Sequence, residues 1–395
     1  MNEVITTEKY PIKMWLRNIE DGALKQAKNL ANLPFLFSHV AIMPDAHQGY
    51  GMPIGGVMAT QGVVVPNAVG VDIGCGMKAV RTDIKSELFT TEIIKKIFGG
   101  SSEYKGGIRS KVPMGFGHQS KKQDENLMPE APGPVVTNQY SSALKQLGTL
   151  GGGNHFIELQ QDLEGFIWVM IHSGSRNLGF TVAHHYDKIA KELNKKWNTV
   201  VPANWDLAFL PLDTDEGALY MQEMTYCVEF AKSNRALMIT NVLDSIIESG
   251  VVDSMGITVS IDVAHNYAAF EHHYGTNVLI HRKGATKAYN GELGIIPGSQ
   301  GTASYIVKGK GNKDSFMSCS HGAGRKMGRK EAERSLSLTE EIDKLNMLGI
   351  VHGVRTVKDL DEAPGAYKDI DVVMSNQQDL VDVEYKLLPM AVLKG

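Results

Sequence analysis

The sequence predicts a mixed α/β protein of the α+β class, folded as one large domain over residues 1–395. Apolar, β-type runs end in glycine-rich turns along the whole chain, and segments with helical periodicity lie between them. Glycine supplies 41 of the 395 residues, about 10% against a usual ~7%, and no repeat, low-complexity linker or composition break divides the chain. We therefore expect strand ends and glycine-rich turns to build one central site.

Five runs have the composition of buried strands. Four of them end at a polar turn: GFIWVMIH (165–172), GITVSIDVAHN (256–266), NVLIHRKGAT (277–286) and DSFMSCSHG (314–322). The fifth, DVEYKLLPMAVLKG (382–395), alternates into the apolar run MAVL, which predicts a final buried strand or extended segment. Burial of that run would hold Lys394 at a fixed place.

Two helices and one loop are predicted from local signals. Asp213 and Glu216 have the D-x-x-E spacing of a capping box, which predicts a long helix through about Ser249. A shorter amphipathic helix is predicted over residues 182–198. Residues 121–137 contain three prolines and predict an exposed loop.

Composition excludes several classes of protein. The formal net charge is −4, from 40 Lys and Arg against 44 Asp and Glu, which excludes nucleic-acid binding by bulk charge but allows a local basic groove. No window approaches the roughly 18 consecutive apolar residues of a membrane helix, and the first residues lack the apolar region of a secretory signal. With three cysteines, a reduced, cytoplasmic protein without membrane contact is expected.

Five side chains at glycine-bordered turns have the chemistry of metal ligands. Asp72 and Cys75 lie three residues apart in VGVDIGCGM, and His155, His172 and His265 each stand beside a β-type run, next to a polar turn. One such histidine alone is more often a hydrogen-bonded core residue, but five candidates together favour a metal site. They exceed the ligands of one tetrahedral ion, so two ions sharing the thiolate fit the count better. Ligand softness favours zinc or cobalt, and the residues alone leave the metal open.

His321 stands at a different kind of turn. It opens HGAGR, and a third helix is predicted just after it, through RKMGRKEAERSL (325–336). An imidazole at a helix N-terminus beside Arg325 would lie where phosphate binds, and it could act as a nucleophile. PGSQGTAS (297–304) supplies a second turn rich in backbone N–H groups. A helix cap with incidental glycines would explain either turn equally well by itself.

Basic residues gather near these turns. A groove for a phosphodiester backbone explains the clustering, whereas solvated helix faces explain part of it. The residues concerned are Arg282, Lys283, Lys287, Lys308, Lys310, Lys313, Arg325, Lys326, Arg329 and Lys330. On the residues alone, a dinuclear metal-dependent phosphohydrolase acting on RNA ends remains an alternative, as does an RNA-binding protein that keeps a structural metal. Neither alternative needs GTP.

The motifs together resemble those of the RtcB family of RNA ligases, over essentially the whole chain. They occur in the family's order: MPDAHQGYG, VGVDIGCGM, LGTLGGGNHFIEL, HSGSRNLG, DVAHN, HRKGAT, GIIPGSQGTASYIV, SHGAGR and the final KG. The resemblance implies a GTP- and Mn²⁺-dependent ligase that joins an RNA 3′-phosphate or 2′,3′-cyclic phosphate to a 5′-hydroxyl end. Its role would be RNA repair or tRNA splicing, through a guanylylated histidine and an RNA-ppG intermediate.

Roles are implied motif by motif. The two Mn²⁺ ions would be held by Asp72, Cys75, His155, His172 and His265, with Cys75 bridging, and the guanylylated histidine would be His321. Contacts to GTP would come from Asn154, His155, Phe156, Ile157, Glu158, His265, Asn266, Pro297, Gly298, Ser299, Gln300, Ser304, His321, Gly322, Ala323, Gly324 and Lys394. A monomer acting on RNA is expected, and the need for an archease-type activator is left open.

Four positions depart from the tRNA-splicing pattern. Tyr50 stands where GKG would carry a lysine, Asn177 where a glycine follows HSGSR, Gln300 where PGSMG has methionine, and Gly328 where a serine is expected. The implied metal and nucleophile positions are intact. The departures therefore concern the RNA substrate, and they favour a branch that repairs broken RNA.

Overall fold

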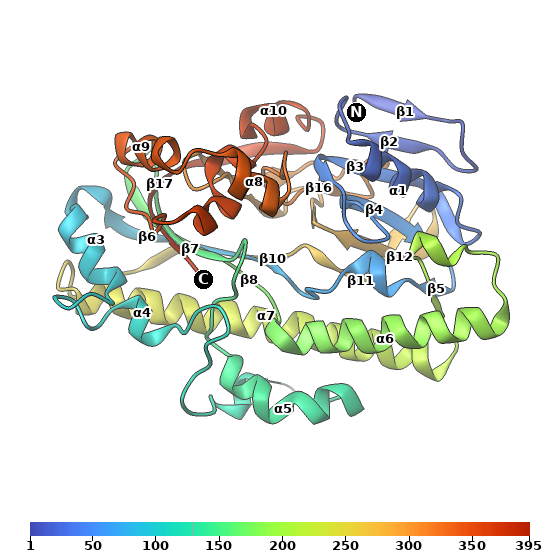
Figure 1. Ribbon diagram of the computed structural model, residues 1–395, viewed down its shortest axis with the longest axis horizontal. Helices are drawn as coiled ribbons and strands as arrows, with labels where there is room; N and C mark the ends of the chain where they lie inside the picture. Colours follow the sequence, from blue (N-terminus) through green and yellow to red (C-terminus); the bar gives the residue numbers. More distant parts are fainter. Residues whose placement is uncertain (129) are drawn as a thin grey trace.

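Two antiparallel-rich sheets form the centre of the computed structural model, which describes residues 1–128 and 130–395 (Figure 1). The six-stranded sheet has the order β1 (Glu3–Ile5), β2 (Ile12–Met14), β3 (Leu36–His47), β4 (Ile54–Thr60), β12 (Thr276–Lys283), β11 (Asn266–His273). Only the β2–β3 pair in this sheet is parallel. The mixed helix-and-sheet class predicted from the sequence is confirmed.

The seven-stranded sheet is antiparallel throughout and takes its strands from distant parts of the chain. Its order is β10 (Ile257–Ala264), β6 (Gly76–Lys85), β8 (Phe166–Ser173), β7 (Phe156–Asp162), β17 (Val381–Lys394), β15 (Ser304–Gly309), β14 (Leu293–Ile296). Two short pairs complete the strands of the described residues: β13 (Ala285–Lys287) with β16 (Ser318–Ser320), and β5 (Val63–Val64) with β9 (Leu210–Pro211).

Helices cover the sheets from two sides (Figure 1). Along one side run α5 (Pro134–Gln146), α6 (Arg176–Trp197) and α7 (Asp215–Glu248), with α3 (Thr91–Phe98) and α4 (Ile108–Lys111) at one end. On the other side lie α8 (Arg329–Ser335), α9 (Leu338–Met347) and α10 (Ile370–Ser375). The remaining α-helices of the described residues are α1 (Asp21–Ala31) and α2 (Pro66–Val69). No helix of the described residues combines the length and apolar character needed to cross a bilayer.

Helix α7 connects two parts of the core. Its first half, which includes Cys227 and Phe230, packs against residues of α6 such as Val182. Its second half, with Met238 and Val242, packs under the seven-stranded sheet. Because burial of apolar surface is the main stabilising term, this 34-residue helix holds the sheet at a fixed position relative to α6. Cys227 is fully buried there.

Strand predictions were confirmed more often than helix boundaries. The strands β8, β10, β12 and β17 form where they were expected. In the run 314–322, only Ser318–Ser320 is a strand, because Phe316 and Met317 adopt left-handed backbone conformations, with φ of 50° each, that interrupt extended pairing. Helix α6 begins at Arg176, six residues before its predicted start at 182.

Three further predictions were wrong in part. The N-cap of α7 is Thr214, whose hydroxyl accepts a hydrogen bond from Gly217 N, and Asp213 lies outside the helix. In the segment 121–137, helix α5 begins at Pro134 and buries Val135 and Val136, while Pro129 lies outside the described residues. The helix predicted just after His321 begins only at Arg329, because the backbone between them bonds to neighbouring segments: Ala323 N to Pro297 O, and Lys326 N to Ala366 O.

The corrected N-cap makes a stability prediction. Thr214→Ala removes the acceptor for Gly217 N, and should lower the free energy of unfolding by about 1 kcal/mol. The exposed Asp213 makes no cap, so Asp213→Ala should leave stability nearly unchanged. Urea denaturation of the two variants beside the wild type measures this. A larger loss for Asp213→Ala would restore the capping box predicted from the sequence.

Candidate functional site

A cleft of about 960 Å³ is lined by residues of both large sheets. It brings together most of the residues singled out from the sequence: Asp72, Cys75, Asn154, His155, Phe156, Glu158, His172, His265, Asn266, Pro297, Gly298, Ser299, Gln300, His321, Gly322, Ala323, Gly324 and Lys394. We call this the central cleft. Two predicted residues do not line it. Ile157 packs its side chain into the core on the other face of β7, and the Ser304 hydroxyl is buried between Gly298 N and the Gln160 amide.

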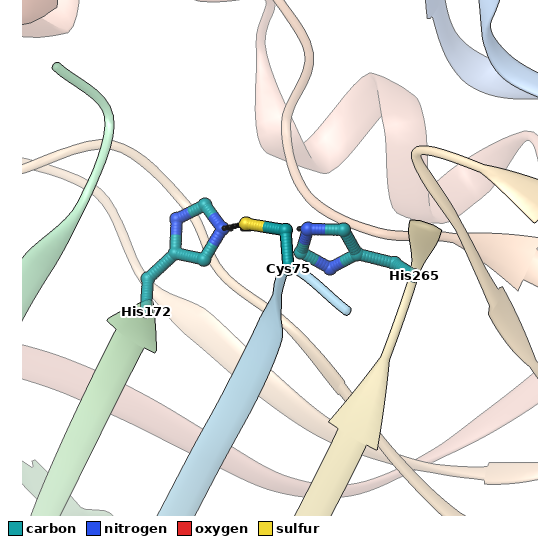
Figure 2. Close-up of side chains that lie close together, drawn as sticks. All are labelled: Cys75, His172 and His265. Carbon is teal, nitrogen blue, oxygen red and sulfur yellow. Dashed lines mark hydrogen bonds between the residues drawn. The ribbon is translucent and has the colours of Figure 1, made fainter. Parts of the chain in front are cut away.

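Cys75, His172 and His265 converge at the ends of three neighbouring strands (Figure 2). Strand β6 lies between β8 and β10, with Met77 opposite His172 and Gly76 opposite Ala264. This register sets Cys75, just before β6, between the two histidines. Its Sγ lies 3.2 Å from His172 Nε2, which lies 3.4 Å from His265 Nε2.

A second group shares the same thiol. Cys75 Sγ lies 3.3 Å from His155 Nε2, and that nitrogen lies 3.1 Å from Asp72 Oδ2. In each group the ligand atoms lie within 4.8 Å of one another, with Cys75 common to both. The close approach requires glycine at position 174, since a Cβ there would lie 2.3 Å from Asp72 Oδ1. The geometry thus presents two adjacent sets of donors around one sulfur.

The protonation of these side chains fits a bound cation. Burial holds the pKa of His172 and of His265 well below the ordinary value, so both imidazoles are neutral. His172 Nδ1 donates to the Asn154 carbonyl at 3.1 Å, which leaves a lone pair on Nε2 directed at the cluster. Burial, with the nearby Asp72, raises the pKa of the Cys75 thiol, and a metal ion would reverse that direction because a coordinating thiol loses its proton.

Two buried side chains of α7 hold the backbone of this cluster. Arg235 Nη1 donates to the carbonyls of Gly74 and Ser173, each at 3.0 Å, and the guanidinium also pairs with Asp262 of β10 at 2.6 Å. The Asn234 amide bonds Thr149 and the residues after His172. Helix α7 therefore positions the segments that carry Cys75, His172 and His265.

His321 lies beside the His265 end of the cluster and is paired with a buried aspartate. Its Nδ1 is 2.6 Å from Asp45 Oδ2, which also accepts the His321 backbone N–H at 3.1 Å. The ring centre lies 4.8 Å from that of His265. Because Nδ1–H donates to the carboxylate, Nε2 is the ring nitrogen that remains for nucleophilic attack. His321 is thus oriented by Asp45 in a turn, and the prediction that it lies at a helix N-terminus was wrong.

One end of the central cleft carries a buried acid and a lysine. Lys394, at the end of β17, is paired with Phe156 of β7, and its Nζ lies 5.6 Å from the ring centre. Burial raises the pKa of Glu158 to about 8, and lowers the pKa of Lys394 against the opposing charges of Glu362, Asp361 and Glu158. Glu158 Oε1 has no hydrogen-bond partner among the described residues. These groups offer both donors and acceptors to a polar ligand.

The basic residues expected in one groove separate into two sets. Lys283, Arg325, Lys326 and Arg329 line the central cleft. The others form ion pairs or lie elsewhere: Arg282 with Glu271, Lys287 with Glu292, Lys308 with Glu384, Lys310 with Asp382, and Lys330 with Glu333. Four of the ten residues therefore line the cleft, from β12, the turn after His321 and the start of α8, and Lys394 of β17 joins them. Arg325 and Arg329 pair with Glu362 there.

Sequence reasoning missed Asp45, Asn234 and Arg235. Asp45 stands in MPDAHQG, two residues after the β-type run VAIM ends at Met43. An acidic residue so soon after a buried run is the signal that could have identified it. Asn234 and Arg235 carry no such signal. Two polar residues within a helix are usually interpreted as part of its solvent-exposed face, and only the tertiary structure shows that these two are buried.

Comparison with known proteins identifies the family. Residues 26–395 match the family described as "tRNA-splicing ligase RtcB". The RNA-splicing ligase RtcB of Escherichia coli strain K12 is 38% identical over 417 residues, covering 100% of this chain and 99% of that protein. The tRNA-splicing ligases RtcB of Nanoarchaeum equitans and Thermococcus kodakarensis are each 32% identical, covering 95% of this chain and 92% of each relative. The chain therefore belongs to the RtcB family of RNA ligases.

The buried acid makes a pH prediction. Between pH values of about 4.5 and 8, folded Glu158 keeps its proton whereas the unfolded chain has lost it, so stability falls as pH rises through this window. Glu158→Gln, which cannot titrate, should flatten that fall. Thermal midpoints of both proteins across the window measure the difference. Parallel curves for the two proteins would show that Glu158 is ionised in the fold.

Proposed function

We propose that this RtcB-family enzyme joins an RNA 3′-phosphate or 2′,3′-cyclic phosphate to a 5′-hydroxyl end, using GTP and two divalent metal ions. The observation that carries the proposal is the Asp45–His321 pair, which directs an imidazole lone pair into a cleft beside the Cys75 donor groups. In a dinuclear hydrolase the ions would activate the water, and such a pair would serve only as a general acid or base and not as a nucleophile. The ligase therefore accounts for more of the site than a dinuclear phosphohydrolase does.

Two overlapping donor groups would hold the ions: Asp72, Cys75 and His155 in one, Cys75, His172 and His265 in the other. The resemblance to the family implies manganese, although a thiolate and imidazoles also suit zinc. Bound ions would neutralise the negative charge on phosphoryl oxygens. Binding of metal ions requires neutral imidazoles, as at His172 and His265, and it is favoured by a carboxylate such as Asp72 beside His155.

His321 would act as the nucleophile toward GTP. Its Nε2 forms a bond to the α-phosphorus while the bond to pyrophosphate breaks, giving a phosphoramidate that carries GMP. The Asp45 carboxylate keeps Nδ1–H in place and stabilises positive charge on the ring as it reacts, as a buried carboxylate does for a catalytic histidine. In the turns at 297–300 and 321–324, the backbone N–H groups of Gln300, Gly322 and Gly324 would donate to phosphate oxygens. The other N–H groups of these turns donate to protein atoms. Lys394 and Glu158 would contact the guanine nucleotide.

GMP would then pass from His321 to the RNA 3′-phosphate, breaking the P–N bond and forming an anhydride. That transfer is needed because a 3′-phosphate has no good leaving group. The 5′-hydroxyl oxygen attacks the activated phosphorus and displaces GMP, which leaves a 3′–5′ phosphodiester. Lys326 at the cleft would balance the charge of the RNA phosphates. Arg325 and Arg329 also line the cleft, and each pairs with Glu362. Repair of broken RNA, by a monomer of residues 1–395 acting as one domain, is the proposed role.

The shared thiol predicts metal content. Cys75→Ala should reduce bound manganese or zinc from two ions per chain toward one or none, because both donor groups lose a ligand. Cys227→Ala and Cys319→Ala are matched controls, since both thiols are buried and belong to neither group. Metal analysis after dialysis against each metal gives the occupancy. Equal occupancy in all three variants would remove the shared thiol from the proposal.

The nucleophile predicts a covalent adduct. With labelled GTP and Mn²⁺, the wild type should retain acid-labile GMP after denaturation, and His321→Ala should retain none. Asp45→Asn, which loses one charged hydrogen bond, should slow adduct formation roughly tenfold to a hundredfold. Both variants should still seal RNA that carries a chemically pre-formed ppG end.

Metal content and thermal midpoint serve as controls for these two variants. A normal adduct yield in His321→Ala would assign the nucleophile to another residue. A wild type that forms no adduct yet releases inorganic phosphate from RNA ends would favour the phosphohydrolase.

A further inference from the structure

Tyr50 is an aromatic residue with no packing role that the structure reveals. Its side chain lines the central cleft and is 77% exposed. Among the described residues, it has no hydrogen-bond or ring partner. A large exposed aromatic side chain is common on protein surfaces, but here it stands at the mouth of the cleft that contains His321. Its exposure is therefore relevant to ligand binding.

The loop that presents Tyr50 is fixed on several sides. Lys283, buried in β12, donates its Nζ hydrogens to the carbonyl of Tyr50 at 2.5 Å and to that of Asn67 at 2.9 Å. The Gln26 amide pairs with both backbone groups of Gly49, at 2.7 and 3.0 Å. At Gly51, a Cβ would lie 2.5 Å from the Asp206 carbonyl. These contacts restrain the backbone of the loop, and among the described residues the ring has no partner of its own.

Tyr50 lines the central cleft on a different sheet from the proposed guanosine contacts Phe156 and Lys394. It lies in the turn between β3 and β4 of the six-stranded sheet, whereas Phe156 and Lys394 lie in β7 and β17 of the seven-stranded sheet (Figure 1). The end of β12 links the Tyr50 loop to the reacting histidine. Lys283 bonds the Tyr50 carbonyl, and the next residue, Gly284, packs beside His321: a Cβ on Gly284 would lie 3.1 Å from His321 Cε1. The Tyr50 loop and the segment beside His321 are therefore held by consecutive residues, and both line the central cleft.

We propose that Tyr50 is a stacking platform for an unpaired base of the RNA, next to the end that reacts at His321. This inference rests on the proposed function and names a residue that selects its substrate. Every nucleobase offers a flat face to an aromatic ring, so such a platform binds single-stranded RNA with little sequence preference. The fixed loop lowers the entropic cost of ordering the ring when RNA binds. A lysine at this position would contact phosphate, whereas the ring requires an unstacked base.

The test uses short single-stranded oligoribonucleotides that carry 2-aminopurine, whose fluorescence is quenched by stacking. The probe base is placed at the terminal nucleotide of a 3′-phosphate strand, at the first nucleotide of a 5′-hydroxyl strand, or in the interior of either. Wild type and Tyr50→Phe should quench one of the two end-labelled strands and not the interior probes. Tyr50→Ala should lose that quench and bind the same strand about tenfold more weakly. Phe270→Ala is the matched control, since Phe270 is 64% exposed on β11 and does not line the cleft.

GMP-adduct formation on the same proteins separates this inference from the proposed function. Tyr50→Ala should form the adduct with a GTP dependence within twofold of the wild type while joining RNA more slowly. An equal loss of adduct formation would place the ring against GTP and overturn the inference. Unchanged quench and affinity in Tyr50→Ala, or quench lost equally in Phe270→Ala, would also overturn it. A wild type that quenches through Tyr50 but forms no adduct would overturn the guanylylation mechanism and leave the platform intact.

Discussion

The buried guanidinium of Arg235 is the interaction on which the geometry of the cluster depends. It bonds the Gly74 and Ser173 carbonyls and the Asp262 carboxylate, three segments that are far apart in sequence. A buried charge is costly unless every donor is paired, so none of the three acceptors can move without leaving another group unsatisfied. The clustered thiol and imidazoles at these strand ends thus take their spacing from a helix that contributes no ligand.

The strand ends could be predicted from the sequence because their signals are local. An apolar run of β-type residues followed by a glycine turn predicts a strand and its end. A histidine at that position therefore lies at the end of a strand, whichever strands are its neighbours. Cys75, His155, His172 and His265 were grouped on this basis, and the antiparallel register brings them together. Their roles as ligands follow from chemistry and resemblance. The order of strands in the sheet decides which of these side chains are neighbours, and no short stretch of the sequence predicts that order.

The parts that sequence reasoning missed depend on long-range packing. Asp45 and His321 are separated by 276 positions, so neither predicts the other. The chain after His321 has helical composition, yet Gly324, with φ of 72°, and hydrogen bonds to distant carbonyls hold it as a turn. Tertiary contacts overrode local preference in this segment. The shift of the α7 cap from Asp213 to Thr214 is local instead, because the Thr214 hydroxyl donates to the Pro211 carbonyl three residues earlier and accepts from Gly217 N.

The place of β17 has a consequence for biosynthesis. This strand lies between β7 and β15, which precede it by at least 70 residues in the sequence, so the sheet has an open seam until the strand is inserted. A ribosome makes β17 after every other strand of that sheet, and the nascent chain must emerge through residue 394 before the seam can close. Edges exposed on β7 and β15 during that interval are templates for mispairing. The cleft is therefore completed only after β17 has been made, and a product truncated before this strand would expose both edges and lack Lys394.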